Sequence, residues 1–198
     1  ENYQPISPTV IYDINGNQLD IITLENRAPV HINEVPLDVQ NAFLAIEDRK
    51  FRTHHGFDYM RLGKAVLSNV TGSAKEGGSS ITQQLAKNAF LSPERSFDRK
   101  LKEALLAIEI ERRYTKDEIL ENYLNTIYFG NGSYGIKNAA RKYFDKEPKD
   151  LTIAEAAILA SIPKSPTKYS PTKNMKNAIE RQQVVLAQMY KYKFITEA

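Results

Sequence analysis

The chain contains no cysteine, which excludes disulfide bonds, thiolate catalysis and cysteine-ligated zinc. Its three histidines leave few ligands for a metal site. It has no uninterrupted run of ~18 to 20 apolar residues, so the sequence predicts no membrane-spanning helix. A large excess of one charge is also missing, because 27 basic and 24 acidic residues leave a net charge of only +3. Nucleic acid is therefore not an expected partner, and any anionic ligand must meet a local cluster of cations.

The composition is that of a globular protein. With 198 residues, 41% of them hydrophobic, and with nine glycines and nine prolines, the chain fits one cooperative unit with up to two lobes. It begins at Glu1, without an initiator methionine or a signal peptide, and it stops directly after a helical pattern. We therefore expect a fragment of a longer protein from which a C-terminal continuation was removed.

The first 36 residues have strand and turn signals, and helical signals dominate afterwards. Runs 9–12 and 19–24 flank Asn15-Gly16, a strong turn signal, and predict a small β-hairpin. We expect an N-terminal leader over 1–36 and a mainly α domain over 37–198. The expected helices are one that follows Pro36 and ends near Glu47, and others over 58–70, 80–89, 96–114, 116–125, 153–161 and 174–192.

Several local patterns refine these helices. Capping boxes, which satisfy the first amides of a helix, are predicted for Ser80 with Gln83, Thr115 with Glu118 and Thr152 with Glu155. The helix over 153–161 is small and apolar enough for the core. The helix over 96–114 is expected to be a central, half-buried rod, because its apolar residues form one stripe, namely Phe97, Leu101, Leu105 and Ile108. Glycines interrupt residues 130–135, and the proline-rich stretch 163–171 is expected to be a loop.

Three familiar motifs are incomplete. Residues 72–79 have the glycine spacing of a phosphate-binding P-loop, but Gly78 stands where the lysine belongs. Residues 161–173 contain three Ser-x-x-Lys patterns, yet the chain lacks the Ser-x-Asn and Lys-Thr-Gly elements of penicillin-recognising serine enzymes. His54 and His55 are adjacent, so their side chains point apart and a structural role is favoured over a metal pair.

A carboxylate pattern occurs at the end of the first expected helix. Glu47 directly follows the apolar pair Ala45-Ile46 and opens the charged segment 47–58. A carboxylate partly shielded from water in this way is suited to accept a proton. The alternative is that the helix simply frays into a solvated loop.

A second polar pattern lies on the helix over 80–89. Ser80, Gln84 and Lys87 recur at helical spacing and share one face, and glycines precede the helix start. A hydroxyl, an amide and an ammonium on one face suit the binding of anionic or sugar oxygens. The alternative is a solvated helix face with a good N-cap.

A third pattern crowds charges into residues 95–103. Lys100 precedes Glu103 by three residues, which is the less favourable order for an ion pair that stabilises a helix. Stability alone therefore does not account for this choice, although charge runs are commonly solvated faces. These three patterns indicate an anion-binding carboxylate enzyme and go no further by themselves.

Four long motifs occur in one order along the chain. They are Glu47-Asp48-Arg49-x-Phe51-x-x-His54-x-Gly56-x-Asp58, Gly77-Gly78-Ser79-x-Ile81-Thr82-Gln83-Gln84-Leu85-x-Lys87-Asn88, Arg99-Lys100-x-x-Glu103, and the stretch from Arg113 to Gly130. Together they resemble the peptidoglycan glycosyltransferases that polymerise lipid II, over about Val35 to Ile195. Ser80 departs from the family pattern, which usually has threonine there, but it retains the hydroxyl. The leader resembles the segment that follows the membrane anchor in bifunctional, class A penicillin-binding proteins.

The resemblance implies a lysozyme-like, two-lobed helical fold and an inverting transfer between lipid-linked sugars. The growing chain is the donor and a new lipid II is the acceptor. Glu47 is implied to be the general base that takes the proton from the acceptor 4-hydroxyl. The leaving undecaprenyl diphosphate is already anionic and needs charge stabilisation, which is assigned to four cations, namely Lys87, Arg95, Arg99 and Lys100.

The remaining site residues are implied in the same way. Glu103 is the second catalytic carboxylate and orients the cations or the donor diphosphate. That role is compatible with a divalent cation, Mg or Mn, although the sequence requires no cofactor. The residues expected to hold sugar or phosphate oxygens are Ser79, Gln84 and Asn88. The residues expected to support the motifs are Asp48, Phe51, His54, Thr82 and Gln83.

A lipid-linked substrate implies contact with the membrane. Residues 58–78 would form a mobile, membrane-proximal lobe, in which Arg61 and Lys64 face lipid headgroups. The alternative is that the apolar side of this segment packs inward. The family also implies the extracytoplasmic face of the bacterial cell membrane and inhibition by moenomycin-type compounds.

Two other functions stay open at this point. A lysozyme-like glycan hydrolase or lytic transglycosylase shares a helical fold and a glutamate, but its leaving sugar needs a general acid, and four cations have no role in that reaction. A non-catalytic module that binds lipid II or glycan is the second alternative.

Overall fold

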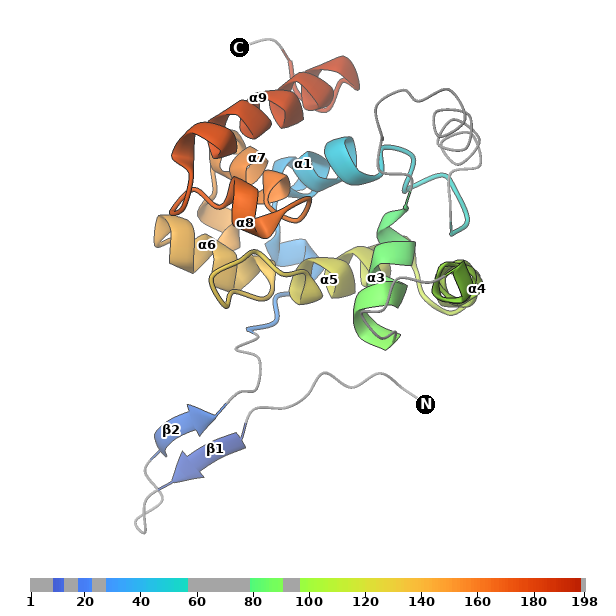
Figure 1. The fold of residues 1–198 in the computed structure, drawn as a ribbon, viewed down its shortest axis with the longest axis horizontal. Coiled ribbons are helices and arrows are strands. Elements are labelled where there is room, and N and C mark those ends of the chain that lie inside the picture. Colours follow the sequence, from blue (N-terminus) through green and yellow to red (C-terminus); the bar gives the residue numbers. More distant parts are fainter. Residues whose placement is uncertain (1–8, 13–17, 23–27, 57–78, 91–96, 197–198) are drawn as a thin grey trace.

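The computed structural model describes residues 9–12, 18–22, 28–56, 79–90 and 97–196 of the chain. The described part is mainly helical, as expected (Figure 1). Its α-helices are α1 (Leu37–Glu47), α3 (Ile81–Phe90), α4 (Phe97–Arg113), α5 (Lys116–Thr126), α6 (Ile136–Phe144), α7 (Ile153–Ser161), α8 (Pro166–Tyr169) and α9 (Met175–Lys191). Two short 3-10 helices are η1 (Ile32–Glu34) and η2 (Pro148–Asp150).

Two short strands precede the helices. Strands β1 (Thr9–Tyr12) and β2 (Gln18–Ile22) pair antiparallel, with Thr9 opposite Ile22 and an irregularity between Ile11 and Tyr12. The second strand begins one residue earlier and ends two residues earlier than the run 19–24.

Capping interactions set the helix starts as predicted. The Thr115 side chain accepts from the Glu118 amide and the Thr152 side chain accepts from the Glu155 amide, and both boxes are reciprocal. At α3 the Gln83 amide donates to Ser80 Oγ over 3.1 Å, while Gln83 Oε1 accepts from the Ser80 amide over 2.9 Å. The helix that carries much of the site therefore begins where the sequence places it.

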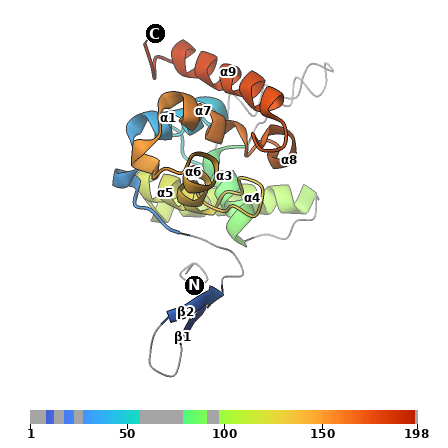
Figure 2. The same ribbon diagram turned by 90° about the vertical axis from the view of Figure 1, so that its left-hand side faces the viewer.

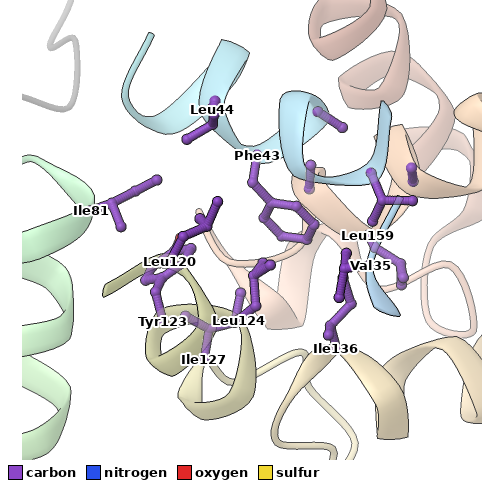
Figure 3. Packing of buried hydrophobic residues seen from close by; sticks show 14 of the residues in the cluster. Val35, Phe43, Leu44, Ile81, Leu120, Tyr123, Leu124, Ile127, Ile136 and Leu159 are labelled. Atoms are coloured by element: carbon purple, nitrogen blue, oxygen red, sulfur yellow. The ribbon is translucent and has the colours of Figure 1, made fainter. Parts of the chain in front are cut away.

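The core lies where α1 packs against α7 and α9, and α3 packs against α4 and α5. In both ribbon views α1 and α7 lie between α9 and α5 (Figures 1 and 2). Figure 3 shows Phe43 of α1 among apolar side chains from α5, α6 and α7. Phe43 is fully buried and meets the Phe129 ring edge to face, with 6.0 Å between ring centroids. Burying a side chain of this size contributes about 1.5 to 3 kcal/mol, so this contact fixes α1 firmly in the helical body.

Helix α4 corrects one expectation. Leu101, Leu105 and Ile108 are 54%, 58% and 40% exposed, so the predicted apolar stripe does not face the core. The opposite face, which carries Glu103 and Ala107, is the buried one. The helix is turned this way because Glu103 belongs to a buried charge cluster, described below, rather than to solvent.

Two helices lie where no helix was predicted. Helix α6 follows the glycine-interrupted segment and begins after Gly135, whose positive φ of 80° a glycine adopts without strain. It is held by burial of Ile136, Ala139 and Ala140. The four-residue α8 occupies part of the expected loop 163–171. By contrast, α7 is the small, apolar core helix that was predicted. Among the described helices, none is both long and apolar enough to cross a bilayer.

Candidate functional site

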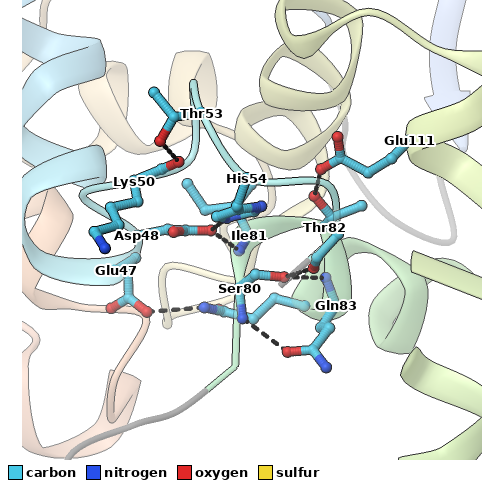
Figure 4. A network of polar contacts seen from close by, with 12 residues as sticks. Glu47, Asp48, Lys50, Thr53, His54, Ser80, Ile81, Thr82, Gln83 and Glu111 are labelled. Carbon is cyan, nitrogen blue, oxygen red and sulfur yellow. Dashed lines mark hydrogen bonds and ion pairs between the residues drawn. The ribbon is translucent and has the colours of Figure 1, made fainter. Parts of the chain in front are cut away.

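The site is built where α1 ends beside α3. Glu47, the last residue of α1, is half-buried, and its Oε2 accepts a hydrogen bond of 2.9 Å from Gln84 Nε2 (Figure 4). A half-buried carboxylate that an amide donor orients is suited to accept a proton from a ligand. The structure thus brings together two residues that were predicted to share a site.

Asp48 fixes the end of α1 to the start of α3. Its Oδ2 lies 2.7 Å from His54 Nε2 and accepts a 2.9 Å bond from the Ile81 amide at the start of α3. Asp48 is 2% exposed, so this shared oxygen is held out of water. A carboxylate at a helix N-terminus also meets the positive end of the helix dipole. Asp48 and His54, both predicted to support the motifs, therefore meet each other, and His54 is a partner of a carboxylate.

Ser80 differs from expectation. It is 4% exposed, and its hydroxyl donates to the Gly56 carbonyl and accepts from the Gln83 amide. The hydroxyl that was predicted to share a ligand-binding face with Gln84 and Lys87 is thus used to start α3 and to bind the end of the loop that follows α1.

A buried network behind α3 was missed by sequence reasoning. Thr82 Oγ1 donates to Glu111 Oε1 over 2.6 Å (Figure 4). Lys116 Nζ lies 2.6 Å from Glu111 Oε2. The same ammonium donates to the His54 carbonyl over 2.6 Å and lies 4.5 Å from the centroid of the Phe51 ring. The network therefore joins α3, α4 and α5 to the loop that carries His54. Phe51 and Thr82, both predicted as supporting residues, are fully buried within it.

Glu103, the second predicted carboxylate, forms ion pairs with two cations. Glu103 of α4 is 1% exposed, and its Oε1 lies 3.0 Å from Arg99 Nε. Its Oε2 lies 2.5 Å from Lys100 Nζ, which also donates to Ser79 Oγ over 2.6 Å. A buried carboxylate is stable only when paired, and here it fixes the positions of two cations. The structure therefore unites Ser79, Arg99, Lys100 and Glu103 as predicted neighbours.

Lys87 links the two carboxylates electrostatically. Burial lowers the pKa of the Lys87 ammonium below its ordinary value of 10.5, against the opposing charge of Glu103. Arg99 and Lys100 act in the same direction as burial, whereas Glu47 opposes it. Lys87 therefore lies in the field of both Glu47 and Glu103, among cations whose mutual repulsion a bound anion would relieve.

The remaining predicted residues lie at the margin of the described site or outside the described part of the chain. Asn88 of α3 is exposed, and Gln83 caps the start of α3. Arg95 and the predicted lobe 58–78 lie outside the described residues. Within the described residues, no group of three or more His, Asp or Glu side chains is placed to hold a metal ion.

Comparisons with known proteins indicate the family of the chain. A family model described as Transglycosylase matches residues 15–190. The chain is similar to penicillin-binding protein 1F of Bacillus subtilis, with 50% identity over 180 residues, covering 90% of this chain and 25% of the relative. It is also similar to penicillin-binding protein 1A of Aquifex aeolicus, with 45% identity over 197 residues, covering 99% of this chain and 27% of the relative.

A solved structure gives the same result. The crystal structure of penicillin-binding protein 1A from Haemophilus influenzae matches with a TM-score of 0.52 and 26% identity, covering 100% of this chain and 20% of that one. The chain thus spans about a quarter of the length of the curated relatives it matches.

Proposed function

The chain belongs to the transglycosylase family, and on that premise we propose that it polymerises lipid II into the β-1,4-linked glycan strands of bacterial peptidoglycan. The observation that carries the proposal is the pairing of a half-buried carboxylate, Glu47, with a separate set of cations assembled on the buried Glu103. A base on one side and positive charge on the other match a reaction whose leaving group is already anionic.

In the proposed step, Glu47 takes the proton of the acceptor 4-hydroxyl as that oxygen attacks the donor anomeric carbon. The new carbon–oxygen bond forms on one face while the bond to the diphosphate breaks on the other, so the configuration inverts. The electron pair of the breaking bond leaves with undecaprenyl diphosphate. Lys87, Arg99 and Lys100 stabilise its charge, and we assign Arg95 to the same group.

Glu103 acts as the fixed counter-charge of these cations. Its carboxylate oxygens are both engaged by Arg99 and Lys100, so it holds the cations in place before the substrate arrives. A Mg or Mn ion has no set of three acidic or histidine ligands within the described residues.

The membrane setting is part of the proposal. The relatives are penicillin-binding proteins, and we place this chain on the extracytoplasmic face of the bacterial cell membrane, joined to an N-terminal anchor. The exposed Leu101, Leu105 and Ile108 of α4 support contact with the lipid surface that presents the substrate. A two-lobed, lysozyme-like arrangement, with residues 58–78 as the lobe near the membrane and residues 1–36 as a leader, stays a prediction. Moenomycin-type inhibitors are proposed to compete at the same cleft.

The test is to supply purified lipid II and to separate the products by length. The wild-type chain is expected to form long glycan strands, and Glu47→Gln to reduce their formation by about 10²- to 10⁴-fold, as for loss of a general base. Cleavage of preformed glycan without any polymer would instead identify a hydrolase. Binding of lipid II by both forms without turnover would identify a binding module.

A further inference from the structure

A second group of cations gathers at the C-terminal end of α9. Arg49 follows Glu47 by two residues, and its Nη1 donates to the Tyr192 hydroxyl. The Arg49 Cζ atom also lies 4.9 Å from the centroid of the Tyr192 ring. On the same ring, Lys191 Nζ lies 5.8 Å from the centroid. One tyrosine therefore holds two positive charges close to the proposed base.

These two charges are not neutralised by the described part of the chain. Arg52, Arg99 and Arg141 each pair with a carboxylate, whereas the described contacts of Arg49 and Lys191 involve Tyr192 alone. Glu47 and Asp48, the acidic residues nearest to Arg49 in sequence, have other partners.

Glu47 accepts from Gln84, and Asp48 accepts from the Ile81 amide beside His54. Arg49 and Lys191 are both exposed, so their charges face solvent.

The arrangement favours an anion physically. Two cations on one ring repel each other, and an exposed cation–π contact is weak, so an anion that meets both is favoured over either contact alone. The Tyr192 hydroxyl limits the rotation of the Arg49 guanidinium, which reduces the entropy lost on binding. A guanidinium fork matches the oxygens of a phosphate, and a neighbouring ammonium adds charge.

We propose that Arg49 and Lys191, gathered by Tyr192, form a binding site for a phosphate group, and that this group belongs to the diphosphate of the acceptor. The assignment rests on the proposed function, in which two lipid-linked diphosphates approach Glu47 and the cations on Glu103 serve the donor. Helices α1 and α9 pack together and end on the same side of the molecule (Figure 1), so the Arg49 site adjoins the residue that activates the acceptor.

The kinetic test varies labelled lipid II against a saturating lipid-linked glycan donor. Arg49→Gln and Lys191→Gln are each expected to raise the KM for lipid II about tenfold, as for the loss of one charge-assisted contact, with kcat within about twofold of wild type. Tyr192→Phe keeps the ring but loses the hydroxyl, so its effect should lie between wild type and Tyr192→Leu.

Arg181→Gln is the matched control, because Arg181 also lies on α9 and its Cζ is 6.0 Å from the Tyr169 ring. It is expected to leave the KM for lipid II unchanged. Thermal unfolding of every variant checks that the fold is retained.

A binding test does not depend on turnover. Calorimetry with inorganic diphosphate is performed in a Lys87→Gln background, where the first cation group is weakened, and Arg49→Gln is expected to weaken the remaining binding about tenfold. If lipid II is polymerised but Arg49→Gln changes neither the KM nor diphosphate binding, the site is overturned. If no polymer forms while diphosphate binding still depends on Arg49, the proposed function fails and the anion site stands.

Vesicles of neutral and anionic phospholipid distinguish the source of the phosphate. The proposal expects Arg49→Gln to bind both kinds of vesicle as wild type does. Weaker binding to anionic vesicles with an unchanged KM for lipid II would overturn the acceptor assignment in favour of a lipid headgroup.

Discussion

Gln84 Nε2 donates a 2.9 Å hydrogen bond to Glu47 Oε2, and this contact joins the last residue of α1 to the middle of α3. Both helix ends are fixed by Asp48, so the donor and the carboxylate are held by the same scaffold. The orientation of the proposed base is thereby set before any substrate binds.

Gln84→Leu is expected to lower kcat about ten- to a hundredfold, because Glu47 loses the donor that orients it. The KM for lipid II should change less. Single-turnover rates of glycan extension provide the measurement. Wild-type kcat in this variant would show that the amide contributes nothing to the orientation of Glu47.

The alkaline side of the pH profile should report Lys87. Its pKa lies below 10.5, chiefly through burial, so the ammonium is lost at a lower pH than in an ordinary lysine. We expect kcat/KM to fall on the alkaline side below pH 10.5 and Lys87→Arg to move that fall upward. A pH–rate profile of both proteins is the measurement, and an identical alkaline limb in both would contradict the assignment.

Lys87 should also lower the free energy of unfolding near neutral pH. Because the folded pKa is depressed, the unfolded chain binds more protons between that pKa and 10.5, and the free energy of unfolding rises with pH across this window. Lys87→Met should remove this rise and stabilise the fold at neutral pH while abolishing turnover. Urea unfolding at a series of pH values measures both effects. A parallel pH dependence in the variant would assign the rise to another group.

The network behind α3 predicts a contrast between two variants of Thr82. Thr82→Val keeps the volume but removes the hydroxyl that donates to Glu111, and it should cost about 1 to 2 kcal/mol of unfolding free energy. Thr82→Ser keeps the hydroxyl and loses one buried methyl group, at a cost of about 0.5 to 1.5 kcal/mol. Combining each variant with Glu111→Gln separates the contribution of the hydrogen bond to Glu111 from that of the buried methyl group. The coupling energy with Glu111→Gln should be large for Thr82→Val, which loses the hydroxyl, and small for Thr82→Ser, which keeps it.

The turn before α6 predicts a difference between two glycines. Both Gly132 and Gly135 have positive φ, so alanine at either position should cost about 1 kcal/mol through the backbone. At Gly135 an added Cβ would also lie 2.8 Å from the Asn125 carbonyl oxygen, whereas at Gly132 nothing lies within 4 Å. Gly135→Ala should therefore lower the unfolding midpoint clearly more than Gly132→Ala in thermal denaturation. Equal losses would show that the close contact relaxes at no cost.

Local patterns in the sequence predicted the helix starts well, because a capping box is decided within four residues. The Thr115 and Thr152 boxes and the Ser80–Gln83 pair all formed as read. The orientation of α4 could not be read in the same way. Its buried face carries Glu103 and Ala107, and only the three-dimensional partners of Glu103 make that face the inner one.

For a similar reason, contacts within one helix of the site were predicted and contacts between helices were not. The pairing of Glu103 with Arg99 and Lys100 lies within one helix and followed from the motif. The network through Glu111 and Lys116 joins helices α3, α4 and α5, so no spacing in the chain reveals it. One signal was available, since Glu111 lies eight residues after Glu103 and so shares its side of α4.

The shared carboxylate of Glu103 has a consequence for how this protein can change by mutation. Its two oxygens are divided between Arg99 and Lys100, so replacing Glu103 alone leaves two adjacent cations in mutual repulsion. Replacing one cation alone instead leaves a buried negative charge half compensated. Tolerated variation at these three positions should therefore arise as coordinated sets of substitutions, and single-site libraries will find almost none of it.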